Sequence, residues 1–233
     1  MGLFVIWHIF ATFLWVAPAS PLREVVPKSA LRGYMSPLFG QSWSVFAPSP
    51  INGDYYLDIR AQVKNGDGDE SVTDWVRATD VETSWIRHNL TPPRSAGLAV
   101  DVTRGLYTEY KDLDESSQEL VGLNWHKDAW NERLAERLTA ESSNAPDKYL
   151  EAEERVAAYA TQVAYAVWGD DVDKVQFRVS RQAVIPFSQR NNPEATRPEP
   201  VSQDYGWRGL IEYDGQSRDQ FRDYFCSAPI GVC

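Results

Sequence analysis

Residues 55–64, YYLDIRAQVK, are the stretch that decides the fold class. Apolar and polar side chains alternate through this stretch, and the apolar ones are Tyr55, Leu57, Ile59, Ala61 and Val63. Successive side chains of a β-strand point to opposite faces of a sheet, so the alternation predicts a strand with one buried face and one solvated face. The opposite positions carry Asp58, Arg60, Gln62 and Lys64, as expected for the solvated face.

The chain that follows this strand predicts a β-hairpin. Residues 65–69, NGDGD, tolerate the positive φ angles of a tight turn, and residues 72–78 can return as an antiparallel partner. The oxygen-bearing side chains of the turn also alternate, as they do in a calcium loop. Val76 stands where an EF-hand needs a bidentate Glu, which favours a solvated turn instead.

Residues 95–168 change to the spacing of helices. The apolar stripes predict three of them, over residues 98–113, 116–138 and 146–169. Ser116 and Glu119 have the spacing of a capping box at the start of the second helix.

Strand-like alternation returns after the helices, at residues 175–180 and again at 205–213, beyond a loop at 186–202. Two strands, a block of helices and two further strands predict an α+β fold. We expect an antiparallel sheet of about four strands with a three-helix insertion packed on it.

An apolar segment opens the chain. Residues 2–17, GLFVIWHIFATFLWVA, contain no charged side chain, and the first one is Arg23. About 20 helical residues cross a bilayer, so the segment predicts an N-terminal transmembrane helix at 1–22. A juxtamembrane connector at 23–50 and a soluble α+β domain at 51–233 complete the expected organisation.

Two other interpretations of the apolar segment remain open. The small residues APA at 17–19 resemble the cleavage site of a removable signal peptide, and a buried core helix is the third alternative. Orientation is open as well. Basic residues after the segment favour a cytoplasmic C-terminus, whereas a large folded domain behind a single segment favours export.

The charge balance bears on the class of partner. The chain has 23 Lys and Arg residues against 33 Asp and Glu residues, for a formal net charge of -10. A phosphate backbone would be repelled, so nucleic-acid binding is not expected.

Local signatures of chemistry are missing from the sequence. It contains no serine-hydrolase elbow, zinc-protease motif, phosphate loop or dinucleotide fingerprint, so we assign no catalytic residue, cofactor or metal. The remaining candidates for acid-base work are histidines and paired carboxylates on helices, whose simpler interpretation is a solvated surface: His88, His126, Asp112 with Asp114, and Glu151 with Glu154.

Cys226 and Cys233 are the only cysteines, and Pro229 and Gly231 between them suit a tight loop. In an exported domain this spacing predicts a disulfide, whereas in the cytoplasm both would be free thiols.

Two segments carry a resemblance to a known family, TFLWVAPASPL at 12–22 and PLFGQSWSVFAPSP at 37–50. They resemble the start of a membrane-anchored actinobacterial family, domain of unknown function 5819. The resemblance implies a single-pass protein of the cell membrane whose domain lies outside the cytoplasm. It also implies a polytopic membrane protein, related to vitamin K-dependent carboxylases, as a partner. It supplies no catalytic residues.

The second segment gives the candidate interaction residues Gln41, Trp43, Phe46 and Pro48. Two large aromatic side chains beside a membrane segment can dock on a membrane or a partner, or they can fill the core of their own domain. The leading hypothesis is therefore an accessory protein held at the membrane. The alternative is an exported hydrolase that acts on cell-envelope material through acidic residues.

Overall fold

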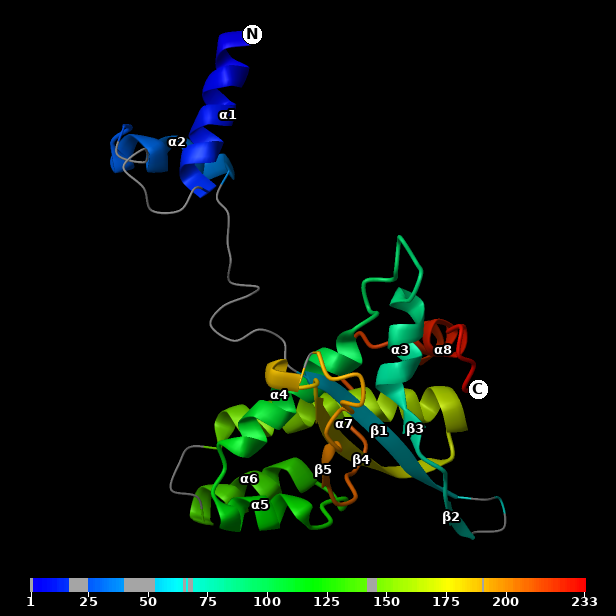
Figure 1. The fold of residues 1–233 in the computed structure, drawn as a ribbon. Helices are drawn as coiled ribbons and strands as arrows, with labels where there is room; N and C mark the ends of the chain where they lie inside the picture. The colour runs from blue at the N-terminus through cyan, green and yellow to red at the C-terminus, as the bar shows by residue number, and fades with distance from the viewer. Residues whose placement is uncertain are drawn as a thin grey trace. The chain divides into compact units, whose positions relative to one another are not determined.

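The computed structural model describes residues 2–16, 25–39, 53–64, 66, 69–141, 146–189 and 191–233. The chain divides into two units, Met1–Asn52 and Gly53–Cys233, which we call the N-terminal unit and the α+β unit. Each is described by itself (Figure 1).

In the part of the N-terminal unit that the structure describes there are two helices, α1 (Gly2–Val16) and α2 (Lys28–Phe39). They bury a small apolar cluster made of Ala11, Leu14, Leu31 and Met35. The ring Nδ1 of His8 lies 3.2 Å from the Tyr34 hydroxyl, which adds a polar contact between the helices.

The predicted transmembrane anchor at 1–22 is wrong. Helix α1 as described has 15 residues, which at about 1.5 Å per residue gives roughly 22 Å, short of a hydrocarbon core of about 30 Å. Among the helices that the structure describes, none is both long enough and apolar enough to cross a membrane.

The α+β unit is built on an antiparallel sheet. Its strands are β1 (Gly53–Lys64), β2 (Glu70–Val72), β3 (Val76–Arg77), β4 (Val172–Ala183) and β5 (Val201–Asp204). The order is β2-β1-β4-β5, and β3 also pairs with β1 (Figure 1). The α+β class, the strand predicted at 55–64 and its hairpin are confirmed.

Helices surround the sheet on the side of its apolar face. They are α3 (Ala78–Ile86), α4 (Leu98–Lys111), α5 (Glu115–Gly122), α6 (Trp130–Glu141), α7 (Asp147–Trp168) and α8 (Arg218–Cys226). A short 3-10 turn, η2, covers Phe187–Gln189.

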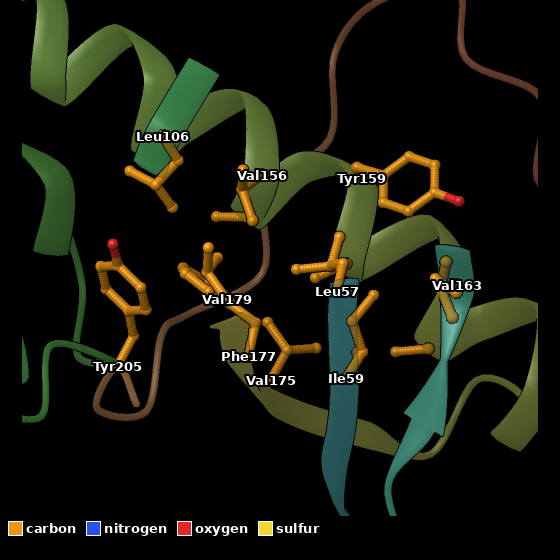
Figure 2. Close-up of a cluster of buried hydrophobic side chains, with 14 of the residues drawn as sticks. Leu57, Ile59, Leu106, Val156, Tyr159, Val163, Val175, Phe177, Val179 and Tyr205 are labelled. Atoms are coloured by element: carbon orange, nitrogen blue, oxygen red, sulfur yellow. The ribbon is translucent and has the colours of Figure 1, made fainter. Parts of the chain in front are cut away.

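The apolar core lies between the sheet and α7 (Figure 2). Leu57 and Ile59 of β1 and Phe177 of β4 are completely buried, and Val156 and Val163 of α7 lie against them. Full burial of one such side chain stabilises the fold by about 1.5–3 kcal/mol. The alternation at 55–64 therefore reflects the packing of β1 against helices.

Two predicted elements differ from the structure. The single helix predicted at 116–138 is instead α5 and α6, separated by a segment whose Trp125 amide donates to the Trp207 carbonyl oxygen at 2.7 Å. The capping residue of α5 is Asp114, which accepts a hydrogen bond from the Ser117 amide, rather than Ser116. The four helices α4 to α7 thus replace the three expected ones.

The strand predicted at 205–213 is also wrong. The last strand, β5, precedes it, and beyond Tyr205 only Arg208 exchanges backbone hydrogen bonds with β4, at Val175. The side chain of Arg208 points into the core. A charged residue is therefore buried where the alternation predicted a solvated one.

Arg208 forms a buried ion pair with Glu153 of α7. Their side chains are 0% and 1% exposed. The guanidinium also donates to the carbonyl oxygens of Leu123 at 2.8 Å and Val121 at 2.6 Å, near the C-terminus of α5. These carbonyls have no partner within their helix, so one side chain joins three elements.

Glycine permits this close approach. A Cβ atom at Gly206 would lie 2.0 Å from the Leu123 carbonyl oxygen, and one at Gly209 would lie 2.7 Å from Trp130 Cδ1. The backbone of 205–209 is therefore packed directly on the segment that follows α5.

A second buried acid, Glu82 of α3, caps α4. One carboxylate oxygen accepts from the amides of Gly97 and Ala99, at 3.1 and 2.6 Å, and the other accepts from the Tyr159 hydroxyl at 2.9 Å. Burial raises the pKa of Glu82, and the three hydrogen bonds oppose that rise. The carboxyl group joins α3, α4 and α7.

Replacing Gly206 with Ala should destabilise the α+β unit by about 3 kcal/mol, because backbone atoms must move to admit the methyl group. Gly105 is the matched control: it lies in α4 with no atom within 4 Å of an added Cβ, so Gly105→Ala should stabilise by about 0.5–1 kcal/mol. Urea denaturation measures both. Equal effects of the two substitutions would contradict the close approach at Gly206.

Glu82→Gln should change how stability depends on pH. A pKa raised in the folded state means that folded protein holds the proton more tightly, so this contribution is largest below the unfolded value and is lost as the pH rises through the raised pKa. The stability of wild type relative to Glu82→Gln should therefore fall as the pH rises from about 4.5 through the raised pKa of Glu82. Exposed Glu136→Gln is the control that should follow wild type. A constant difference would count against the burial of an ionisable group at Glu82.

Candidate functional site

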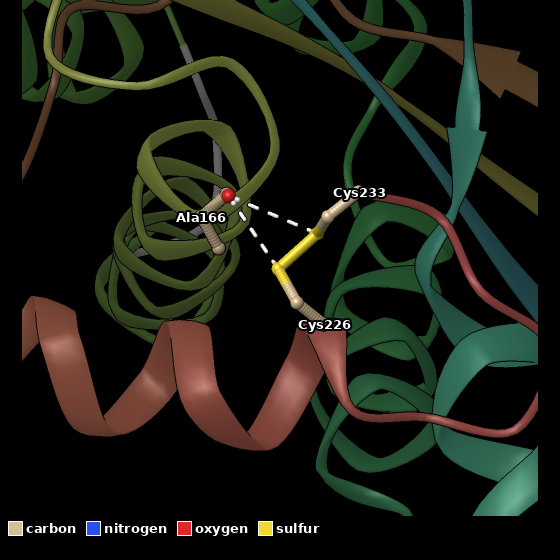
Figure 3. Close-up of a disulfide and its surroundings, with 3 residues drawn as sticks. All are labelled: Ala166, Cys226 and Cys233. Carbon is tan, nitrogen blue, oxygen red and sulfur yellow. Dashed lines mark hydrogen bonds between the residues drawn. A yellow bond between two sulfur atoms is a disulfide. The ribbon is translucent and has the colours of Figure 1, made fainter.

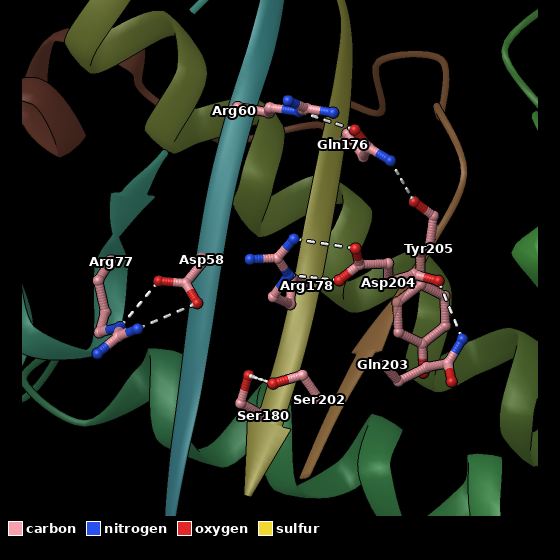
Figure 4. A network of polar contacts seen from close by, with 10 residues as sticks. All are labelled: Asp58, Arg60, Arg77, Gln176, Arg178, Ser180, Ser202, Gln203, Asp204 and Tyr205. Carbon is pink, nitrogen blue, oxygen red and sulfur yellow. Dashed lines mark hydrogen bonds and ion pairs between the residues drawn. The ribbon is translucent and has the colours of Figure 1, made fainter. Parts of the chain in front are cut away.

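One face of the sheet points away from the helices that cover its apolar side (Figure 4). We call it the open sheet face. It includes Asp58 and Arg60 of β1, Gln176 and Arg178 of β4, and Asp204 of β5, together with Arg77, Trp75 and Trp207. The alternation predicted Asp58, Arg60, Gln176 and Arg178 as solvated, although Asp58 is only 5% exposed. It placed Trp207 among the apolar residues.

Two arginines of this face are fixed by carboxylates. The Arg77 Nε atom donates to Asp58 at 2.8 Å, and Arg178 makes two hydrogen bonds to Asp204, one of them from Nη2 at 2.9 Å. These bonds raise the pKa of both guanidinium groups, so both remain charged. Paired contacts of this kind hold arginine side chains in one orientation.

Arg60 is held differently. Its Nε atom donates to the Gln176 side chain at 2.8 Å, and the Gln176 amide in turn donates to the Tyr205 carbonyl oxygen at 2.7 Å. Among the residues that the structure describes, no carboxylate forms an ion pair with Arg60. The orientation of the Arg60 side chain is thus fixed by Gln176, while its positive charge is not paired with a carboxylate among the described residues.

Tryptophan rings cover these cations. The guanidinium carbon of Arg60 lies 4.5 Å from the centroid of Trp75 and 5.5 Å from that of Trp207, and the carbon of Arg178 lies 4.7 Å from Trp75. Cation–π contacts at these distances contribute about 0.5–1 kcal/mol each when exposed. Both tryptophans remain partly exposed, so the face offers rigid aromatic and cationic groups to a partner.

The interaction residues expected from the sequence, Gln41, Trp43, Phe46 and Pro48, lie outside the described residues. The structure therefore gives no geometry for that hypothesis.

Cys226 and Cys233 form a disulfide with a Cα–Cα distance of 5.4 Å (Figure 3). Their sulfurs lie 3.5 and 3.8 Å from the Ala166 carbonyl oxygen of α7. A disulfide sulfur carries no hydrogen to donate, so we interpret these as packing contacts. They hold the C-terminal loop against α7.

The candidate acid-base residues are dispersed. His88 is exposed after α3. His126 lies between α5 and α6, where burial and then the charge of Lys174 lower its pKa. Asp112 ends α4 and Asp114 caps α5.

The two candidate carboxylates of α7, Glu151 and Glu154, each bind another side chain. Glu151 forms an ion pair with Arg155, and Glu154 accepts from Asn131 at 2.9 Å. Within the described parts of the chain, no three metal-binding side chains lie together.

Comparison with known proteins gives one positive result. The model of the family of unknown function DUF5819 matches residues 20–210, well over half of the 233-residue chain. The searches of curated proteins and of solved structures returned no match. The family expected from the sequence is confirmed, and the chain belongs to the family of unknown function DUF5819.

Proposed function

We propose that the protein is an accessory protein that associates with a membrane and binds a protein partner through the open sheet face. The observation that carries this proposal is the cluster of Arg60, Trp75 and Trp207. Tryptophan, tyrosine and arginine dominate the residues whose truncation most weakens protein interfaces. Here they lie on a sheet face that the helices leave uncovered.

The geometry favours binding over catalysis. The guanidinium groups of Arg77 and Arg178 are already neutralised by Asp58 and Asp204, so they serve as a fixed frame. Arg60 has its Nε atom engaged, and its terminal nitrogens have no acidic partner in the described structure. A partner that supplies a carboxylate or carbonyl oxygen to Arg60 would complete the arrangement with little reordering of side chains. The resemblance to a membrane family suggests a polytopic membrane protein as that partner.

Helix α1 supports the membrane part of the proposal. It carries no charge, and its exposed apolar side chains include Leu3, Ile6 and Ile9, which are 86%, 64% and 63% exposed. We infer that α1 inserts into the apolar layer of a bilayer without crossing it, while exposed Lys28 and Arg32 of α2 meet the head groups.

The disulfide supports a location of the α+β unit outside the cytoplasm, because disulfides persist in oxidising compartments. No contact among the described residues favours the alternative, an exported hydrolase, since the histidines and acidic pairs are not brought together with a second catalytic group.

A photoreactive residue on the open sheet face should crosslink to the partner in native membranes. We would place p-benzoylphenylalanine at Gln62, two residues after Arg60 in β1, or at Ser202 of β5, and at Leu90, which is fully exposed, as a control. The first two positions should give the same adduct, and mass spectrometry should identify a polytopic membrane protein. Adding Arg60→Ala should lower the yield about tenfold, as expected for a loss of roughly 1.4 kcal/mol. If neither position gives an adduct that Arg60→Ala weakens, the proposed partner site is wrong.

Membrane association should depend on the apolar surface of α1. The double variant Ile6→Lys and Ile9→Lys in the full chain should reduce binding to phosphatidylcholine vesicles at least tenfold, since burial of each isoleucine contributes about 1.5 kcal/mol or more. The matched variant Ser29→Lys and Ser36→Lys adds the same charge to exposed positions of α2 and should bind as wild type. Flotation of the vesicles measures both. Recovery of native protein that lacks α1 would favour a cleaved signal peptide instead.

A further inference from the structure

The α+β unit has a pocket between α4, α7 and α8, away from the groups that make up the open sheet face. Its volume is about 460 Å³, and the loop at 213–217 closes one side. The main apolar and aromatic lining residues are Leu98, Tyr159, Phe221 and Tyr224. Pockets that hold small molecules usually have volumes of about 300–1,000 Å³ and apolar walls, so this one has a suitable size and lining.

The aromatic walls are held in place by the fold. The hydroxyl of Tyr159 donates to buried Glu82, and its ring meets Phe221 of α8 edge to face at 5.8 Å. Tyr224 stacks on Trp85 of α3 at 6.1 Å. Burial, with the charge of Glu82, raises the pKa of Tyr224 to about 12, so its hydroxyl stays neutral. The rings therefore keep their positions when the pocket is empty of ligand.

Side-chain amides supply the polar part of the lining, from Gln162, Gln216 and Gln220. The Gln216 oxygen accepts from the Tyr213 amide at 2.8 Å and lies 3.4 Å from the Gln162 nitrogen. Amides both donate and accept, so they recognise hydrogen-bonding groups that carry no charge.

The charged groups at the pocket also favour an uncharged ligand. Among the described residues that line the pocket, Arg155 is the one with a charged side chain, and it forms an ion pair with Glu151. Glu154 and Glu151 raise the pKa of neighbouring Tyr213 beyond the effect of burial, whereas Arg155 lowers it. The positive charge of Arg155 is thus at least balanced by Glu151 and Glu154, which disfavours an anionic ligand.

We propose that this pocket binds a small, uncharged aromatic molecule that carries a hydrogen-bonding group. Its rings would lie against Tyr159, Phe221 and Tyr224, and its polar group would meet the glutamine amides. This site is separate from the proposed partner surface, so either proposal can fail without the other.

The test uses two probes that differ by one charged group. N-phenyl-1-naphthylamine is an uncharged aromatic amine, and 8-anilinonaphthalene-1-sulfonate is its sulfonated counterpart. Titration of the full chain, followed by direct excitation of each probe, should show the uncharged probe binding at least tenfold more tightly.

Two substitutions fill the pocket from opposite walls. Leu98→Trp on α4 and Gln220→Trp on α8 both start from exposed side chains, and each should weaken binding of the uncharged probe at least tenfold. Leu90→Trp is the matched control: it makes the same change at a fully exposed position outside the lining and should leave the affinity within twofold. Probe bound to the exposed surface of α1 contributes equally to all variants.

Unchanged affinity in both filling variants, with melting temperatures like that of wild type, would overturn the proposal. If the sulfonate probe binds more tightly than the uncharged probe, and Arg155→Gln removes that binding, the pocket does not select an uncharged ligand and this part of the proposal is overturned. Loss of binding of the uncharged probe in both filling variants, with binding retained in Leu90→Trp, would support it.

Discussion

The ion pair between Arg208 and Glu153 is the interaction on which the α+β unit depends most. Removal of one member of such a buried pair leaves a charge without a partner and costs about 3–5 kcal/mol. Arg208 also binds the carbonyl groups at the end of α5 and lies 5.7 Å from the ring centroid of Trp130. Helices α5, α6 and α7 therefore meet around a single guanidinium group, and the backbone of the same residue pairs with Val175 of β4.

The open sheet face depends on this buried contact. Tyr205 and Trp207 precede Arg208 in the chain, so the backbone that binds Arg208 in the core also sets the positions of these two residues. The Tyr205 carbonyl fixes Gln176, which fixes Arg60, and the ring of Trp207 covers the same guanidinium. The positions of the cluster residues Arg60 and Trp207 are thus set by the packing of the core.

The sequence predicted the elements whose periodicity follows simple burial. The strand at 55–64 and the helix that ends near Gly169 correspond to β1 and α7. The apolar stripe of α7 lies against the sheet as expected, and residues 157–164 are buried on every side of the helix. Arg208 could not be predicted in the same way, since an arginine in an alternating segment is read as solvated. Its burial explains why the expected strand at 205–213 does not form.

Other differences have separate physical causes. Helix α8 is mostly polar and meets the core through few side chains, Phe225 among them, so its apolar stripe is too sparse to stand out. Its capping residue Ser217 was the available signal, because its side chain accepts from the Gln220 amide. The apolar N-terminal segment met the hydropathy expected of a membrane span, but helix length decides that question. The contacts of Trp75 could not be predicted from the sequence, because its ring covers Arg60 and Arg178, which lie on two strands that are distant in sequence.

The pairing of β1 with β4 has a consequence for the order of folding. The registered residues Ile59 and Phe177 are 118 positions apart, so the centre of the sheet is a contact of high sequence separation. Such contacts form slowly, because a long loop must close before they stabilise the chain. A nascent chain that ends before β4 leaves β1 without its main neighbour and with apolar side chains exposed along an unpaired edge. The protein is therefore most prone to self-association while it is being synthesised, and that risk falls once β4, which ends at Ala183, pairs with β1.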